Sequence, residues 1–337
     1  MNWEKIQSCA MQQELLRRRC TMENMKKEKK GLKKFTDFAL SNFVIVAFVI
    51  LFISSYFLSP AFFTKNNLLS VLIQNSIYAI CAMGMLIIII TGGIDLSTGA
   101  YVCIVVCLTA GLIQDGHGVA SIFIVLVMAL GIGAVSGSMV AFLNIAPFIA
   151  TLAMTTILKG AAYMYQTGQN RRIDGTFLPK WVKSSTLGVP NPVLVMIVVY
   201  LVVLFVLNRT RFGRGIYAIG GNKETAYLAG IKVKSYLVLS YALGGMCFAI
   251  SGILLCGRLG MGTATVGEGY EMDAIASVVI GGASMNGGTG SVTKTIVGAM
   301  FMGVLYNIMN LMGIASYPQM IVKGVVIVLA VLLYKTK

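Results

Sequence analysis

The sequence predicts an all-α, polytopic membrane protein with about ten transmembrane helices, some of them broken. Of its 337 residues, 57% are hydrophobic and only 12% are charged, a composition far outside that of soluble globular domains. The mean hydropathy is +0.82, and the apolar residues form repeated stretches long enough to span a bilayer. The net charge of +15 comes from Lys and Arg at the two termini and in one loop. That distribution is typical of cytoplasmic segments of membrane proteins, so we do not expect a nucleic-acid partner.

The chain begins with a basic tail, residues 1–37, which contains RRR at 17–19 and KKEKKGLKK at 26–34. The tail is too charged to bury a core, so we expect it to be disordered in the cytoplasm or to lie on anionic lipid headgroups. Met22 and Met25 precede a typical basic leader, and translation could start at one of them. Residues 38–337 then form the membrane domain.

Ten apolar segments follow the tail. They cover approximately residues 39–58, 68–90, 99–113, 119–143, 146–166, 192–208, 236–256, 272–285, 292–312 and 317–334. An even number of crossings that starts in the cytoplasm also ends there, and it places the basic loop 209–235 on the same side, as the charge bias requires. The loop 167–191 falls outside although it carries four basic residues, against the charge bias. The third and eighth segments are short for a bilayer of roughly 30 Å, so half-helices are an alternative for both.

Two of the segments end in glycine-rich polar sequences. TGGIDLSTG at residues 91–99 and GGASMNGGTG at 281–290 each separate two apolar runs. Lipid offers no partner to backbone groups freed by a broken helix, so protein or water must line such a break. Interrupted helices in corresponding halves mark the translocation site of transporters. The similarity of the two motifs therefore predicts an internal repeat and a substrate pathway. The candidate pathway residues in these two motifs are Gly92, Gly93, Asp95, Ser97, Gly281, Gly282 and Ser284.

Asp95 has two interpretations. Asp95 or Ser97 could cap the first turn of the third helix, where a carboxylate also interacts favourably with the positive helix end. Alternatively, the Asp95 carboxylate contacts substrate hydroxyls or carries a proton, because ionisable groups at membrane depth are functional by default.

Other charged residues lie near the ends of apolar runs. Lys159, Arg258 and Lys323 are expected to snorkel to the interface, or to contact a substrate or a delivery protein at the outer face. Three acidic residues, Glu268, Glu271 and Asp273, are expected in an outer loop or helix end.

The loop at residues 209–235 contains a short helix signal. Asn222 is a favourable N-cap, Glu224 lies in the expected first turn, and Gly230 is a favourable C′ residue. A helix of two turns is marginal alone in water, so we expect it to dock onto a partner.

Five sequence blocks carry a resemblance to a known family. They are GGIDLSTG (92–99), APFIATLAMT (146–155), RFGRGIYAIGGNKETAYLAGIKV (211–233), GYEMDAIASVVIGGASMNGGTG (269–290) and SYPQMIVKGVVIVLAVLL (316–333). In this order they resemble the permease subunits of bacterial monosaccharide ABC importers, of the ribose type, and they cover the chain after about residue 38. STG stands where the family often has SVG, and KETAYLAG where EAARLSG is common.

The resemblance implies a subunit of the bacterial inner membrane with both termini in the cytoplasm. Its implied partners are a separate ABC ATPase, an extracytoplasmic sugar-binding protein, and a second copy or paralogue with which it forms a dimer. The second block adds Phe148 and Thr151 to the candidate pathway. The third block implies an ATPase-coupling segment with residues Arg211, Gly213, Gly220, Gly221, Asn222, Lys223 and Glu224.

Missing motifs argue against three alternative functions: a chain that binds ATP itself, an ion-coupled transporter and an intramembrane enzyme. The chain has no G-x-x-x-x-G-K-[ST] motif, so we expect it to bind no cofactor of its own and ATP to bind the partner. An ion-coupled secondary transporter would need Asp95 as a proton relay without an intramembrane histidine or a second clear carboxylate. An intramembrane enzyme would need a base near a serine, and the only histidine is His117 in a short loop. We therefore expect a transport subunit rather than an enzyme, with a neutral aldose, ribose above others, as substrate and a branched-chain amino acid as the alternative.

Overall fold

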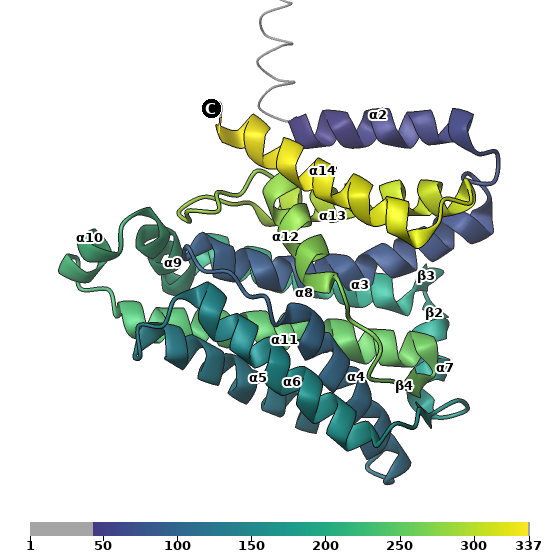
Figure 1. Cartoon of the computed structure of the whole chain (residues 1–337), viewed down its shortest axis with the longest axis horizontal. Coiled ribbons are helices and arrows are strands. Elements are labelled where there is room, and N and C mark those ends of the chain that lie inside the picture. The colour runs from purple at the N-terminus through teal and green to yellow at the C-terminus, as the bar shows by residue number, and fades with distance from the viewer. Residues whose placement is uncertain (1–42, 336–337) are drawn as a thin grey trace, which may run out of the picture. The chain divides into compact units, whose positions relative to one another are not determined.

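The computed structural model describes residues 43–335, which are largely helical (Figure 1). The chain divides into two units, residues 1–47 and 48–337, and the boundary falls inside helix α2 (Phe43–Leu58). The basic tail at residues 1–37 lies outside the described residues. All features discussed below belong to the second unit.

The second unit consists of helices joined by short connections. After α2 follow α3 (Lys65–Ile90), α4 (Thr98–Gln114), α5 (Ala120–Ala141), α6 (Pro147–Gln166), α7 (Phe177–Lys183), α8 (Asn191–Arg209), α9 (Arg211–Gly221), α10 (Lys223–Leu228), α11 (Val233–Leu259), α12 (Tyr270–Ile280), α13 (Val292–Leu311) and α14 (Ser316–Lys335). Two antiparallel pairs of two-residue strands complete it: β1 (Arg171–Arg172) with β4 (Met261–Gly262), and β2 (Ser185–Thr186) with β3 (Val189–Pro190).

Each of the ten expected apolar segments overlaps a helix over its described residues, but in the eighth, 272–285, the helix ends at Ile280. Among the described residues, five helices are long and apolar enough to cross a membrane: α3, α5, α8, α11 and α13. The structure therefore supports a multi-pass membrane protein, while the count of ten crossings and the internal repeat stay predictions.

Helices α3 and α11 form the centre of the unit. In their most apolar stretches 83% of the residues of α3 and 72% of those of α11 are buried, against 28% for α5. A helix that is apolar all round belongs in the interior, which explains the position of MGMLIIII at the end of α3. The two helices approach closely because small residues face each other: a Cβ on Gly84 would lie 2.8 Å from the carbonyl oxygen of Gly244.

Two of the non-helical connections inside the unit are important for the site: 91–97, between α3 and α4, and 263–269, between β4 and α12. Helix α12, with 11 residues, is about 16 Å long, which is half of a hydrocarbon layer of roughly 30 Å. Its length fits the half-helix alternative for the eighth segment. Helix α4, with 17 residues, reaches about 26 Å and is shorter than the five helices that can span, so both alternatives for the third segment stay predictions.

Candidate functional site

Asp95 lies in the break between α3 and α4 and is 1% exposed. Its Oδ1 accepts hydrogen bonds from the backbone N–H of Ser97 at 2.8 Å and from Ser97 Oγ at 2.5 Å. Ser97 is the N-cap residue of α4, and its side chain makes no cap hydrogen bond, so a cap by Ser97 is wrong. The Asp95 carboxylate instead holds the turn that leads into the helix, and its role as a cap or a substrate ligand stays a prediction. In this structure the carboxylate is enclosed by the chain itself.

Side chains from two other helices hold the same break. Thr151 Oγ1 on α6 accepts a hydrogen bond from Leu96 N at 3.1 Å, and Thr155 Oγ1 donates to Leu96 O at 3.0 Å. On α11, Tyr241 Oη donates to Ile94 O at 3.3 Å. These bonds satisfy backbone groups that lipid could not, as a break inside a membrane requires. Thr151 is fully buried, whereas its neighbour in the motif, Phe148, is 56% exposed.

The interrupted helices α3 and α12 end in the same way. After α3, Gly92 N donates to Ile89 O and Gly93 N to Ile88 O; after α12, Gly282 N donates to Val279 O and Ala283 N to Val278 O. Gly92 and Gly282 have φ angles of +78° and +81°. Both ends are thus Schellman motifs with glycine at C′. Beyond the second one, Ser284 Oγ accepts from Asn286 N at 3.2 Å and Ser284 N donates to Thr289 O, which closes the loop 281–290.

The connection 263–269 runs alongside α4. Cys103 Sγ donates to Ala264 O at 3.2 Å, and a Cβ on Gly99 would collide with Gly267 O and the Glu271 carboxylate. Gly99 lies in the first turn of α4, the end opposite to the expected outer loop after Gln114. Glu271 and Asp273 lie in the first turn of α12 and Glu268 lies in the connection just before it, so their expected position at a loop or helix end is confirmed. Their placement on the outer side stays a prediction.

Lys323 and Asp273 form an ion pair between α14 and α12. Lys323 Nζ lies 2.6 Å from Asp273 Oδ1, and the side chains are 15% and 13% exposed. Tyr306 Oη also donates to Asp273 Oδ1 at 3.0 Å, and Lys323 Nζ donates to Gly269 O at 3.1 Å. Lys323 therefore does not snorkel to an interface. Neither residue alone indicated the pair, because fifty positions separate them in the sequence.

The other two cations lie elsewhere. Arg258 Nη2, in the last turn of α11, donates to Gln74 Oε1 on α3 at 3.4 Å. Lys159 is half-buried on α6 and interacts electrostatically with Glu271. The structure thus brings Lys159 toward the start of α12.

The expected short helix in the basic loop is confirmed as α10. Asn222 is its N-cap, with Oδ1 accepting from Thr225 N at 2.8 Å, and Gly230 has a φ of +81°. Two large apolar side chains of this helix, Tyr227 and Leu228, are 71% and 84% exposed. Such exposure in a helix of six residues is typical of a surface that binds a partner.

Sequence reasoning missed the helix before it, α9. Thr210 Oγ1 caps α9 by accepting from Gly213 N at 3.1 Å, and its buried face consists of Gly213, Gly215, Ile216 and Ile219. The spacing of Phe212, Ile216 and Ile219 could have predicted it, but four glycines weaken a helix signal. Of the seven candidate coupling residues, Gly213 is buried, Gly220 is half-buried, and Arg211, Gly221, Asn222, Lys223 and Glu224 are exposed.

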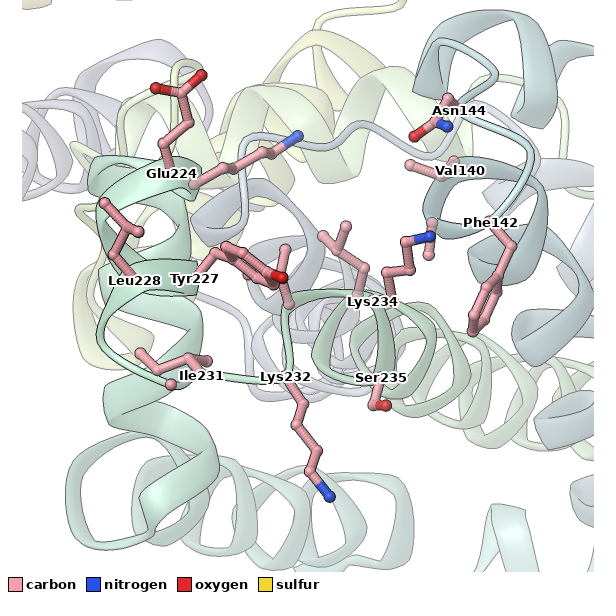
Figure 2. Close-up of a pocket in the computed structure, with 15 residues that line it drawn as sticks. Val140, Phe142, Asn144, Glu224, Tyr227, Leu228, Ile231, Lys232, Lys234 and Ser235 are labelled. Atoms are coloured by element: carbon pink, nitrogen blue, oxygen red, sulfur yellow. The ribbon is translucent and has the colours of Figure 1, made fainter.

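A groove lies between α10, the connection after α5 and the start of α11 (Figure 2). Glu224 and Tyr227 line one side of it, and Phe142 and Lys234 the other, with Lys234 Nζ 5.4 Å from the centre of the Phe142 ring. We call this groove the α10 groove. It combines apolar walls with three lysines, Lys223, Lys232 and Lys234.

Comparison with known proteins decides the family. Residues 67–331 match the family described as "Branched-chain amino acid transport system / permease component". The chain belongs to this permease family. The matched range contains both non-helical connections, the loop 281–290, α9 and α10, so every element of the candidate site belongs to the permease as the family defines it.

Several curated relatives cover most of the permease. The ribose import permease protein RbsC of Escherichia coli K12 is 40% identical over 302 residues, 87% of this chain and 93% of the relative. RbsC of Bacillus subtilis 168 is 39% identical over 283 residues, 83% and 88% of the two chains. The D-allose transport system permease protein AlsC of Escherichia coli K12 is 32% identical over 309 residues, 89% and 94%. No solved structure matches. The permease is accordingly a multi-pass membrane protein and a transport subunit.

Proposed function

We propose that the permease carries a monosaccharide, ribose above others, across the bacterial cytoplasmic membrane as the membrane subunit of an ATP-driven importer. The observation that carries this proposal is the 40% identity to a ribose import permease over 87% of the chain. ATP binds a separate ATPase, a sugar-binding protein delivers the substrate from outside, and a second copy or a paralogue completes the pathway. Both termini lie in the cytoplasm.

The connection 263–269 supports a pathway wall at the start of α12. Thr265 and Glu268 are exposed, although this stretch lies against the first turns of α4. Exposed non-helical backbone is tolerated at membrane depth only where it borders water or protein. We infer that this face borders the pathway together with Lys159, where hydroxyl, carboxylate and ammonium groups can hydrogen-bond a neutral polyol.

The pathway residues suggested by the motifs act mainly behind this wall. Asp95, Ser97 and Thr151 hold the break after α3, and Gly92, Gly93, Gly281 and Gly282 allow the helix ends that shape it. Ser284 closes the loop after α12. Their proposed role is therefore to position the non-helical segments rather than to contact the sugar.

The surface around α10 is the proposed ATPase-binding site. Tyr227 and Leu228 project from a short helix, and the α10 groove beside them carries Lys223, Lys232 and Lys234 around apolar walls (Figure 2). An ATPase surface with apolar side chains, acidic side chains opposite the three lysines and a cation opposite Glu224 would complement it.

Reconstitution in lipid vesicles tests the function. The permease, its ATPase and its sugar-binding protein, taken from the neighbouring genes, are expected to take up radiolabelled ribose only when ATP is present on the ATPase side. The family description favours a second candidate, a branched-chain amino acid, so leucine uptake is measured in parallel. Uptake of leucine but not ribose would select that candidate, and uptake by the permease alone would contradict ATP-driven transport.

A further inference from the structure

Three chain segments meet backbone against backbone where α3 ends. They are the end of α3 with Gly92, the last turn of α9 with Gly220, and the loop after α12 with Gly287 and Gly288. Gly288 N donates a hydrogen bond to Ile90 O at 2.9 Å. Figure 1 shows this loop and the end of α3 reaching α9. We call this contact the glycine junction.

The junction leaves no room for side chains. A Cβ on Gly220 would collide with Ile90 O and Gly288 N and would lie 3.0 Å from Gly288 Cα. A Cβ on Gly287 would lie 2.7 Å from Gly92 N and 2.9 Å from Gly220 Cα. All these neighbours are backbone atoms, which cannot move aside as the end of a flexible side chain can. The close approach of the three segments therefore requires glycine at Gly220 and Gly287.

Helix α9 holds the loop 281–290 at a second point. Tyr217 Oη donates to Gly290 O at 2.9 Å, and Tyr217 lies one helical turn before Gly220. Two contacts one turn apart fix both the position and the orientation of the loop relative to α9. A displacement of α9 must therefore move the loop, and through Ile90 and Gly92 also the end of α3.

The two segments joined to α9 lead to the two non-helical connections. The end of α3 leads into the break 91–97 behind the proposed wall, and the loop 281–290 follows directly on α12, whose first turn adjoins the wall at 263–269. We propose that the glycine junction transmits the movement of α9 to both connections at once, so that Gly220 and Tyr217 are positioning residues that couple ATP hydrolysis to sugar movement. This inference rests on the proposed function, because it assumes an ATPase bound at α10, the helix that follows α9.

Two helical glycines provide a matched pair of variants. Gly220→Ala introduces a methyl group into the junction, whereas Gly131→Ala introduces the same group into α5, where nothing lies within 4 Å of the added Cβ. Both variants are reconstituted with the ATPase and the sugar-binding protein, and ribose uptake and ATP hydrolysis are measured in the same vesicles. We expect Gly131→Ala to match the wild type. Gly220→Ala is expected to retain the ATPase and hydrolyse ATP, with uptake per ATP hydrolysed reduced about tenfold, within the usual range of coupling between two sites.

Tyr217→Phe decides the matter if Gly220→Ala fails to insert in the membrane. It removes only the hydroxyl that bonds Gly290 O, so we expect normal insertion and uptake per ATP reduced about threefold, as for the loss of one hydrogen bond. Normal uptake per ATP in every variant of Gly220 and Tyr217 that inserts in the membrane would overturn the inference. A proportional fall of uptake and hydrolysis would also overturn it, because it indicates structural damage alone. Absence of ATP-driven ribose uptake in the wild type would instead overturn the proposed function.

Discussion

Lys323 Nζ on α14 lies 2.6 Å from Asp273 Oδ1 on α12, and both side chains are largely shielded from solvent. Asp273 also accepts a hydrogen bond from Tyr306, and Lys323 donates to Gly269 O. Desolvated charges of this kind are tolerated because each satisfies the other. The pair therefore ties the start of the half-helix α12 to α14.

Lys323→Met is expected to destabilise the permease by about 3 to 5 kcal/mol, because it leaves the Asp273 carboxylate buried without its cation. Thermal unfolding of the detergent-solubilised protein measures the effect. In the double variant Asp273→Asn with Lys323→Met, much of the lost stability should return. Lys180→Met on the exposed side of α7 is the control. Equal melting temperatures for Lys323→Met and the control would contradict the prediction.

Asp95→Asn is expected to leave membrane insertion and transport mostly intact, since an amide oxygen can still accept from Ser97 N and Oγ. Asp95→Leu leaves the buried N–H of Ser97 without its partner at a cost of about 1 to 3 kcal/mol, so both insertion and transport should fall. Uptake is compared in vesicles with matched amounts of permease. Loss of transport in a normally inserted Asp95→Asn variant would show that the carboxylate itself is needed.

Thr151→Val is expected to destabilise the break after α3 by about 1 to 3 kcal/mol, because it removes the acceptor of Leu96 N at a fully buried position. The matched control is Thr156→Val on the same helix, where the exposed hydroxyl bonds only Leu152 O of its own helix, at 3.4 Å. Hydrogen exchange of the Leu96 amide should become faster in Thr151→Val alone. Unchanged exchange in that variant would mean that the bond contributes nothing to the break.

Glu224→Arg is expected to weaken binding of the ATPase about tenfold or more without unfolding the permease, if its carboxylate faces a cation of the partner. The alanine block Lys223 to Tyr227 should have a larger effect, because it also removes the exposed Tyr227 ring. Co-purification of the ATPase with tagged permease measures both, and the melting temperature of the free permease is the control. Normal co-purification of both variants would leave α10 as an ordinary connection.

Local features were predictable from the sequence because they depend on neighbouring residues. Hydropathy located the ten apolar helices over their described residues but missed the short helices α7 and α9, and the pattern from Asn222 to Gly230 predicted α10 with its cap. The motif at 91–99 revealed the break after α3, because glycines and polar residues cannot continue a lipid-facing helix. The family and the monosaccharide importer followed from short motifs in a fixed order.

Only the tertiary structure decided which residues the non-helical segments contact. The chain turns back along α4 before α12, which brings Glu271 beside Gly99, and it pairs Asp273 with Lys323. It also joins Gly92, Gly220 and Gly287, which lie in three separate segments of the sequence. A glycine at such a contact looks in the sequence like any other glycine in a turn or helix end, because its necessity comes from backbone atoms that only folding brings within reach. Only the structure separates Gly220, which has no room for a Cβ, from its exposed neighbour Gly221.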